Sequence, residues 1–168
     1  MAETTVLAYA KLNLTLDILG RRPDGYHELR MVMQSISLHD TVHLMQTQNG
    51  CIELHSGAPY LPCGPGNLAW RAAESFFEET GLSNPGLCID IKKKIPVCAG
   101  MAGGSSDAAA VLRGLRRLYA PEMPVAALCR IGEKVGSDVP YCVFGGTALA
   151  GGRGEGLTRL APMPACWA

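Results

Sequence analysis

The chain has 168 residues with 15 basic and 15 acidic side chains, so its formal net charge is zero. Hydrophobic residues make up 48% of the chain, enough to bury a core, which excludes a disordered protein. A neutral chain of about one domain's length, with only 18% charged residues, also argues against a protein held on nucleic acid by a basic face.

The N-terminal segment predicts a strand followed by a turn. Apolar and polar side chains alternate over residues 8–18, which is typical of a half-buried strand with one polar face. Pro23-Asp24-Gly25 then predicts a turn. The side chains expected on the buried face are Leu12, Leu14, Leu16 and Ile18.

More β-structure is expected up to residue 56. Residues 30–38 and 41–47 are typical of strands, and Asn49-Gly50 predicts a hairpin into a third strand at 51–55. The following segment, 57–66, is rich in proline and glycine and is expected to be a loop.

Helices dominate the second half of the prediction. Asn67 can cap a helix that ends before Gly81, and residues 107–119 and 124–135 are expected as two more helices. Two further strands are expected, at residues 87–95 and 141–150. Strands first and helices later, around a single sheet, predict the α+β class.

Glycine is the residue in excess, at 20 of 168, about 12% against a usual ~7%. Three glycines lie between the expected strand at 87–95 and the helix at 107–119, where they open the backbone ahead of two serines. Such a turn points free N–H groups and the positive end of a helix dipole at one place, which favours an anion such as phosphate. The segment runs Pro96, Val97, Cys98, Ala99, Gly100, Met101, Ala102, Gly103, Gly104, Ser105 and Ser106.

This turn matches neither a Walker A loop nor the dinucleotide fingerprint. The plainer alternative is a tight strand-to-helix turn with Ser105 or Ser106 as the helix cap. Asp107 would repel a phosphate placed beside it, and a bound Mg²⁺ would relieve that repulsion.

Isolated polar residues leave two alternatives open. Lys11, on the polar face of the first strand, is either a catalytic candidate or a solvated lysine. Asp138, directly after a helix stop, is either a catalytic candidate or the cap of a turn. Tyr26-His27 can hold a planar ligand or lie on the surface. No metal site is expected, because His39 and His43 lack suitably spaced partners.

The seven cysteines are too far apart for a C-x-x-C pair, which argues against a zinc site or a disulfide framework. Reduced thiols in a cytoplasmic protein are expected instead. Residues 1–10 lack the features of a secretory signal, and the charge-free stretch 139–152 is too short to span a bilayer.

Four motifs, in this order, resemble the 4-diphosphocytidyl-2-C-methyl-D-erythritol kinases of the GHMP superfamily. They are Ala8-Tyr9-Ala10-Lys11-Leu12-Asn13-Leu14, Arg22-Pro23-Asp24-Gly25-Tyr26-His27-Glu28, Pro96 to Ala110, and Gly136-Ser137-Asp138-Val139-Pro140. The resemblance runs from about Ala8 to the end of the chain, and the Pro-Asp-Gly-Tyr-His stretch separates this family from other GHMP kinases.

The resemblance implies transfer of the γ-phosphoryl group of ATP to a hydroxyl of 4-(cytidine-5′-diphospho)-2-C-methyl-D-erythritol, in isoprenoid biosynthesis. It implies that Asp138 is the base and that Lys11 orients the acceptor, which suits a reaction dependent on positioning and charge. It places residues 96–106 around the ATP phosphates. Other implied nucleotide positions are Lys93 (alternatively an edge-strand charge) and Asn67; implied substrate positions are Asn13, Tyr26 and His27.

The resemblance further implies that residues 1–168 form the GHMP N-terminal domain, a mixed sheet with helices packed on one face. The family's C-terminal domain is expected to be absent from this chain, which would impair catalysis. A non-catalytic nucleotide- or phosphate-binding fragment and a different GHMP kinase remain as alternatives. Self-association through Met163 and Trp167 is possible, and neither nucleic-acid nor membrane partners are expected.

Overall fold

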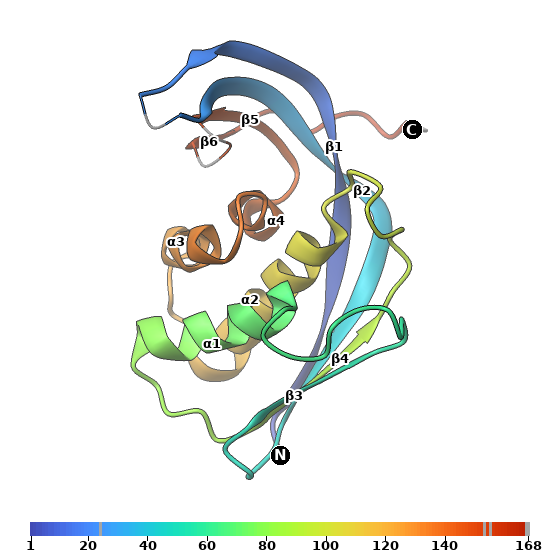
Figure 1. Cartoon of the computed structure of the whole chain (residues 1–168), viewed down its shortest axis with the longest axis vertical. Helices are drawn as coiled ribbons and strands as arrows, with labels where there is room; N and C mark the ends of the chain where they lie inside the picture. Colours follow the sequence, from blue (N-terminus) through green and yellow to red (C-terminus); the bar gives the residue numbers. More distant parts are fainter. Residues whose placement is uncertain (24, 153, 155, 167–168) are drawn as a thin grey trace.

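The computed structural model describes residues 1–23, 25–152, 154 and 156–166. Six strands form one mixed sheet, and the helices cover its concave face (Figure 1). In chain order the elements are β1 (Glu3–Arg21), β2 (His27–Gln46), β3 (Ile52–Ser56), α1 (Leu68–Thr80), β4 (Leu87–Lys92), α2 (Gly103–Tyr119), α3 (Val125–Val135), α4 (Val139–Phe144), β5 (Thr147–Gly152) and β6 (Gly156–Arg159). The predicted α+β class with helices on one face is confirmed.

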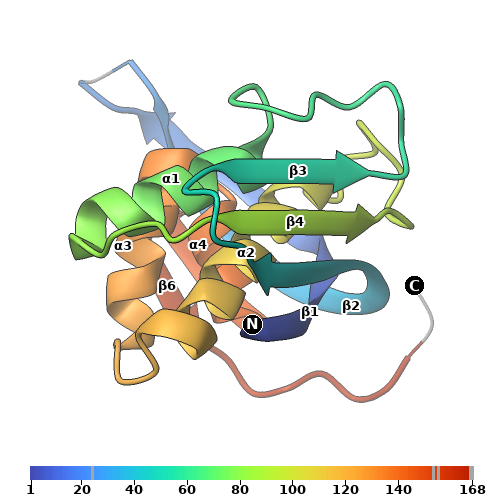
Figure 2. The same ribbon diagram turned by 90° about the horizontal axis from the view of Figure 1, so that it is seen from below.

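The long strand β2 organises the sheet. It pairs with β1 along its whole length, while its other edge is shared by β4 near its C-terminal end and β5 near its N-terminal end. The order β3-β4-β2-β5-β6 therefore contains one parallel pair, β3 with β4, among antiparallel ones (Figure 2). Residues 30–38 and 41–47 are not two strands, as predicted, but parts of this single strand.

The turn at Asn49-Gly50 is present, with a positive φ of 69° at Gly50, but it does not make the predicted hairpin. β3 pairs with β4 rather than β2, because β4 lies between them. The local turn signal contains no information about β4, which begins 31 residues after the end of β3 and pairs between β2 and β3.

The predicted buried face of β1 is wrong. Val6, Ala8 and Ala10 face the core, but the ladder with β2 shifts register between Tyr9 and Lys11, and this turns Lys11 inward as well. Of the four residues predicted on that face, Leu12 is half-buried, whereas Leu14, Leu16 and Ile18 are 43%, 50% and 62% exposed.

Helix boundaries follow the predicted caps at α1 and α3. Asn67 Oδ1 accepts the N–H of Ala69, and Gly81, with φ of 68°, ends α1. Gly136 ends α3. The predicted strand at 141–150 is partly wrong, since residues 139–144 form α4 and only 147–152 form β5.

The core lies between the sheet and the helices. Its largest fully buried side chains include Tyr141, Phe76, Met33 and Leu44. None of the helices in the described part of the chain has the length and hydropathy that a membrane crossing needs.

Candidate active site

The glycine-rich segment forms a loop between β4 and α2 that encloses a cavity of about 220 Å³. Three loop residues have positive φ angles: Cys98 (59°), Gly100 (73°) and Ala102 (55°). These angles turn the backbone around the cavity, and they carry strain at the two residues that are not glycine. The walls are Pro96 to Gly104, together with Leu61, Gly66, Asn67, Leu68, Lys93 and Asp107.

Helix α2 begins at this cavity without a side-chain cap. Its N-cap is Ala102, and the helix starts at Gly103, four residues earlier than predicted. The predicted cap at Ser105 or Ser106 is therefore wrong: Ser106 lies inside the helix, where its hydroxyl donates to the carbonyl of Tyr9 over 2.7 Å. Because no side chain caps them, the first N–H groups of α2 are open to an anion.

Lys93 links the start of the loop to β2 and α2. Its ammonium group donates to Asp40 Oδ2 over 2.5 Å and to Asp107 Oδ2 over 2.6 Å. The other oxygen of Asp40 accepts the backbone N–H groups of Lys94 and Ile95, where the loop departs from β4. Lys93 is thus no edge-strand charge, since β4 lies inside the sheet and the lysine follows it directly.

The three charges of this cluster shift one another's pKa values. Burial raises the pKa of Asp107 to about 7; Lys93 acts to lower it, and Asp40 adds to the rise. Burial by itself would lower the pKa of Lys93, but the two carboxylates outweigh burial and raise it. Asp107 Oδ1 has no hydrogen-bond partner among the described residues, although it is buried and its residue lines the cavity.

A second charged group lies beside the loop. The buried Lys11 Nζ donates to Asn13 Oδ1 over 3.0 Å and lies 3.6 Å from Asp138 Oδ2. Asp138 is the N-cap residue of α4, makes no side-chain capping bond, and its side chain is 35% exposed. The structure therefore brings Lys11 and Asn13 together with Asp138, from two motifs far apart in the sequence.

The main chain connects this group to the loop. The N–H of Lys11 donates to the carbonyl of Met101 over 3.2 Å, and Met101 also lines the loop cavity. Lys11 and Asp138 themselves do not line that cavity. The two parts of the site are thus neighbours across Met101.

The remaining predicted positions are more scattered. Asn67 lines the cavity while it caps α1. Tyr26 and His27 are exposed at the tip of the β1–β2 hairpin, away from the loop cavity, and Asp24 of the same motif lies outside the described residues. The turn is confirmed at Gly25, whose N–H donates to the carbonyl of Arg22 over 3.0 Å.

Sequence reasoning missed Asp40. Asp40 lies between the predicted strands 30–38 and 41–47, where the structure has the single strand β2, and it is fully buried. A charged residue inside an otherwise apolar strand pattern was the available signal, because such a residue needs a partner when it is buried.

Comparison with known proteins agrees with this geometry. The sequence pattern described as "GHMP kinases N terminal domain" matches residues 67–146. A 4-diphosphocytidyl-2-C-methyl-D-erythritol kinase of Geobacter sulfurreducens is 48% identical over 99% of this chain and 60% of its own length. Another, of Clostridium tetani, is 52% identical over 94% of this chain and 56% of its own.

Solved structures extend the similarity to the fold. A crystal structure of a 4-(cytidine 5′-diphospho)-2C-methyl-D-erythritol kinase matches with a TM-score of 0.77 and 42% identity, over 94% of this chain and 55% of that one. A homoserine kinase from Cytophaga hutchinsonii, at 18% identity and a TM-score of 0.70, shares the fold over 89% of this chain and 49% of its own. The chain spans a little over half the length of the curated relatives it matches. It carries the N-terminal domain of the GHMP kinases.

Proposed function

We propose that this chain serves the transfer of the γ-phosphoryl group of ATP to a hydroxyl of 4-(cytidine-5′-diphospho)-2-C-methyl-D-erythritol. The observation that carries the proposal is the junction at Met101, where an open helix terminus and a lysine–aspartate pair become neighbours. The names of the relatives supply the acceptor, which is the compound that their printed names contain.

The loop holds the phosphates of ATP in this proposal. The uncapped start of α2 offers backbone N–H donors and the positive end of a helix dipole. Gly103 lets the backbone lie close to Lys93, since a Cβ there would lie 3.4 Å from Lys93 Nζ. A phosphate in the cavity would therefore meet main-chain donors beside Lys93, whose charge Asp40 and Asp107 already balance.

Asp138 and Lys11 act on the acceptor. Asp138 takes the proton of the attacking hydroxyl, whose oxygen forms a bond to the γ-phosphorus while the bond from that phosphorus to the ADP oxygen breaks. Lys11, held by Asn13, orients the acceptor oxygen and offsets its developing charge. Tyr26 and His27 remain the proposed contacts of the cytosine ring.

Mg²⁺ fits the cavity through one donor. Asp107 Oδ1 is a buried carboxylate oxygen without a partner among the described residues, which is the ligand type that Mg²⁺ prefers. When bound there with ATP, Mg²⁺ would neutralise phosphate charge and remove the repulsion from Asp107.

The test is phosphoryl transfer by this chain, measured as ADP release with and without the cytidine acceptor, together with equilibrium binding of ATP. We expect acceptor-dependent ADP release that falls by about 10²- to 10⁴-fold in Asp138→Asn, with ATP binding unchanged. The exposed Asp17→Asn is the matched control and should keep full activity.

Three other results would each contradict a different part of the proposal. ATP binding without turnover would identify a binding module. Turnover with another small alcohol in place of the cytidine compound would identify a different GHMP kinase. ADP release that ignores both the acceptor and Asp138→Asn would exclude the proposed base.

A further inference from the structure

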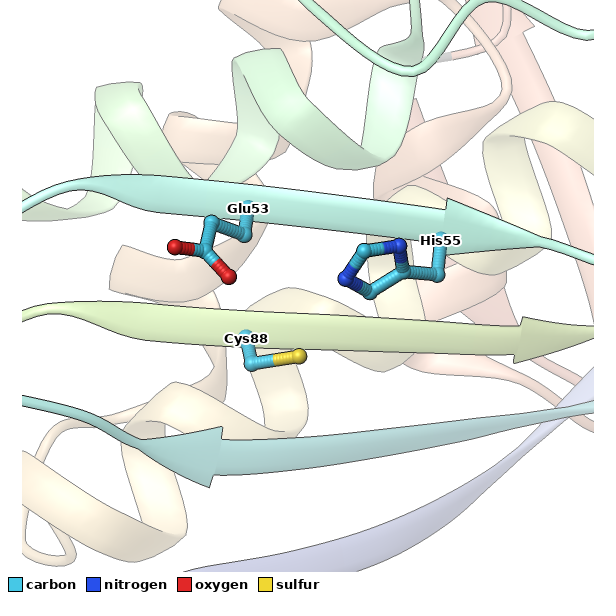
Figure 3. Close-up of side chains that lie close together, drawn as sticks. All are labelled: Glu53, His55 and Cys88. Atoms are coloured by element: carbon cyan, nitrogen blue, oxygen red, sulfur yellow. The ribbon is translucent and has the colours of Figure 1, made fainter.

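Three metal-ligand side chains converge on the outer face of the sheet, outside the loop site. Glu53 and His55 extend from β3 and Cys88 from the neighbouring β4. A carboxylate oxygen, an imidazole nitrogen and the thiol sulfur all lie within 4.8 Å of one another. Figure 3 shows the Glu53 carboxylate and the His55 ring pointing toward each other along β3, with the Cys88 thiol beside them on β4.

The strand register fixes this arrangement. In the parallel ladder Glu53 is the partner of Cys88, and His55 is the partner of Asp90. Side chains two residues apart on a strand share a face, and paired strands lie about 4.8 Å apart, so the backbone alone brings these groups together. A slip by one residue would bury them and expose the core residue Leu54, which keeps the register in place.

The carboxylate of Glu53 is already oriented. Asn49 Nδ2 donates to Glu53 Oε1 over 2.7 Å. Asn49 is itself held, because its Oδ1 accepts the N–H of Cys51 over 3.0 Å and the hydroxyl of Thr47 over 2.8 Å. Hydrogen bonds of this kind orient the ligands of protein metal sites.

The local charge favours a cation. Burial raises the pKa of the Cys88 thiol, and the nearby carboxylates of Glu53 and Asp90 raise it further. Negative charge around a half-buried thiol opposes a lone thiolate, but a divalent cation would reverse that effect and displace the thiol proton to solvent.

We propose that Glu53, His55 and Cys88 bind one Zn²⁺ ion, with water at the fourth position. Carboxylate oxygen, imidazole nitrogen and thiolate sulfur are the three donor types that zinc takes in proteins. Tetrahedral bonds of about 2.0–2.3 Å place donors about 3.5 Å apart, so these side chains would close by about 1 Å. Glu53 and His55 are exposed, so rotation of their side chains allows this closure.

The site could not be found from cysteine spacing. Cys88 lies 33 residues beyond His55, and only the parallel pairing of β3 with β4 makes them neighbours. The expectation of no metal site rested on local spacing, which does not report contacts between strands.

Metal titration of the chain tests this proposal. Zn²⁺ is titrated against a chromophoric chelator, and Co²⁺ is added as a spectroscopic substitute. We expect one Co²⁺ per chain with a sulfur-to-cobalt charge-transfer band, which Cys88→Ser abolishes. We also expect Cys88→Ser, His55→Gln and Glu53→Gln each to weaken Zn²⁺ binding by about 100-fold or more, and Asn49→Ala by about 10-fold.

The controls separate this site from other thiols and from the loop. Cys63→Ser changes an exposed cysteine outside the cluster and should keep both the band and the affinity. Asp138→Asn should also bind Zn²⁺ normally, because the proposed metal site is independent of phosphoryl transfer. Zinc affinity that is equal in the wild type, Glu53→Gln and His55→Gln would overturn the proposal, as would a band that survives Cys88→Ser.

Discussion

Two lysines with largely buried side chains, Lys11 and Lys93, lie beside the glycine-rich loop, and their surroundings differ. Lys93 contacts two buried carboxylates at 2.5 and 2.6 Å, and one of them also accepts two backbone N–H groups. Lys11 lies 3.6 Å from a single carboxylate, Asp138, whose side chain is 35% exposed. One ammonium group contacts two buried carboxylates, while the other faces a carboxylate that solvent reaches.

This difference suits the two lysines to different roles. A buried ion pair is expensive to break, because removing one partner leaves an uncompensated charge in the interior. Lys93 is therefore suited to fix the loop to β2 and β4. The looser pair of Lys11 and Asp138 keeps hydrogen-bonding capacity for an incoming group, as the proposed catalytic role requires.

Replacing each lysine by methionine tests the comparison directly and has the largest expected effects. Lys93→Met leaves Asp40 and Asp107 unpaired and should lower the free energy of unfolding by about 3 kcal/mol. Lys11→Met should lower it by less than about 1 kcal/mol, because Asp138 remains partly solvated, but should reduce turnover by about 10²-fold. Denaturant unfolding and acceptor-dependent ADP release measure the two effects, and equal destabilisation by both variants would remove the distinction.

The pH dependence of stability sharpens the role assigned to Lys93 and its partners. The pKa of Asp107 is raised from 3.8 to about 7 in the folded chain, so folding favours its protonated form. The corresponding stability is fully present below pH 3.8 and is lost as pH rises through about 7.

Comparison with Asp107→Asn isolates this effect. Between about pH 4 and 7 the wild type should lose stability relative to the variant by on the order of 1 kcal/mol per pH unit. Unfolding is measured without ATP or metal. The control is Asp17→Asn, which changes an exposed carboxylate paired with Arg30. A difference between wild type and Asp107→Asn that is flat with pH would show that the carboxyl titrates normally.

Parts of this arrangement were predictable from the sequence, and the reason the rest was not is physical. The motifs around Lys11, Gly103 and Asp138 were recognisable because each is a short local pattern. The inward turn of Lys11 was not, since it depends on a register shift between β1 and β2. The burial of Asp40 and the start of α2 at Gly103 likewise depend on contacts between distant segments.

Two adjacent glycines at the start of α2 provide the smallest and most specific test. A Cβ at Gly103 would lie 3.1 Å from Ile95 Cγ2 and 3.4 Å from Lys93 Nζ, so the helix start would shift by a few tenths of an ångström. At Gly104 the nearest atom is Leu68 Cδ1 at 3.6 Å, an ordinary contact. Gly103→Ala should therefore weaken ATP binding by about 5-fold, the equivalent of one hydrogen bond of about 1 kcal/mol to the phosphates.

Gly104→Ala is the matched control and should leave ATP affinity unchanged, with stability equal or slightly higher because alanine favours a helix more than glycine does. Calorimetric ATP titration of both variants measures the difference. Equal losses would mean that flexibility of the glycine pair matters, whereas a loss confined to Gly103→Ala would mean that its close contacts with Ile95 and Lys93 set the position of the first N–H groups of α2. The second result would join the two lysines in one site, because Lys93 would then help to position the loop that lies beside Lys11.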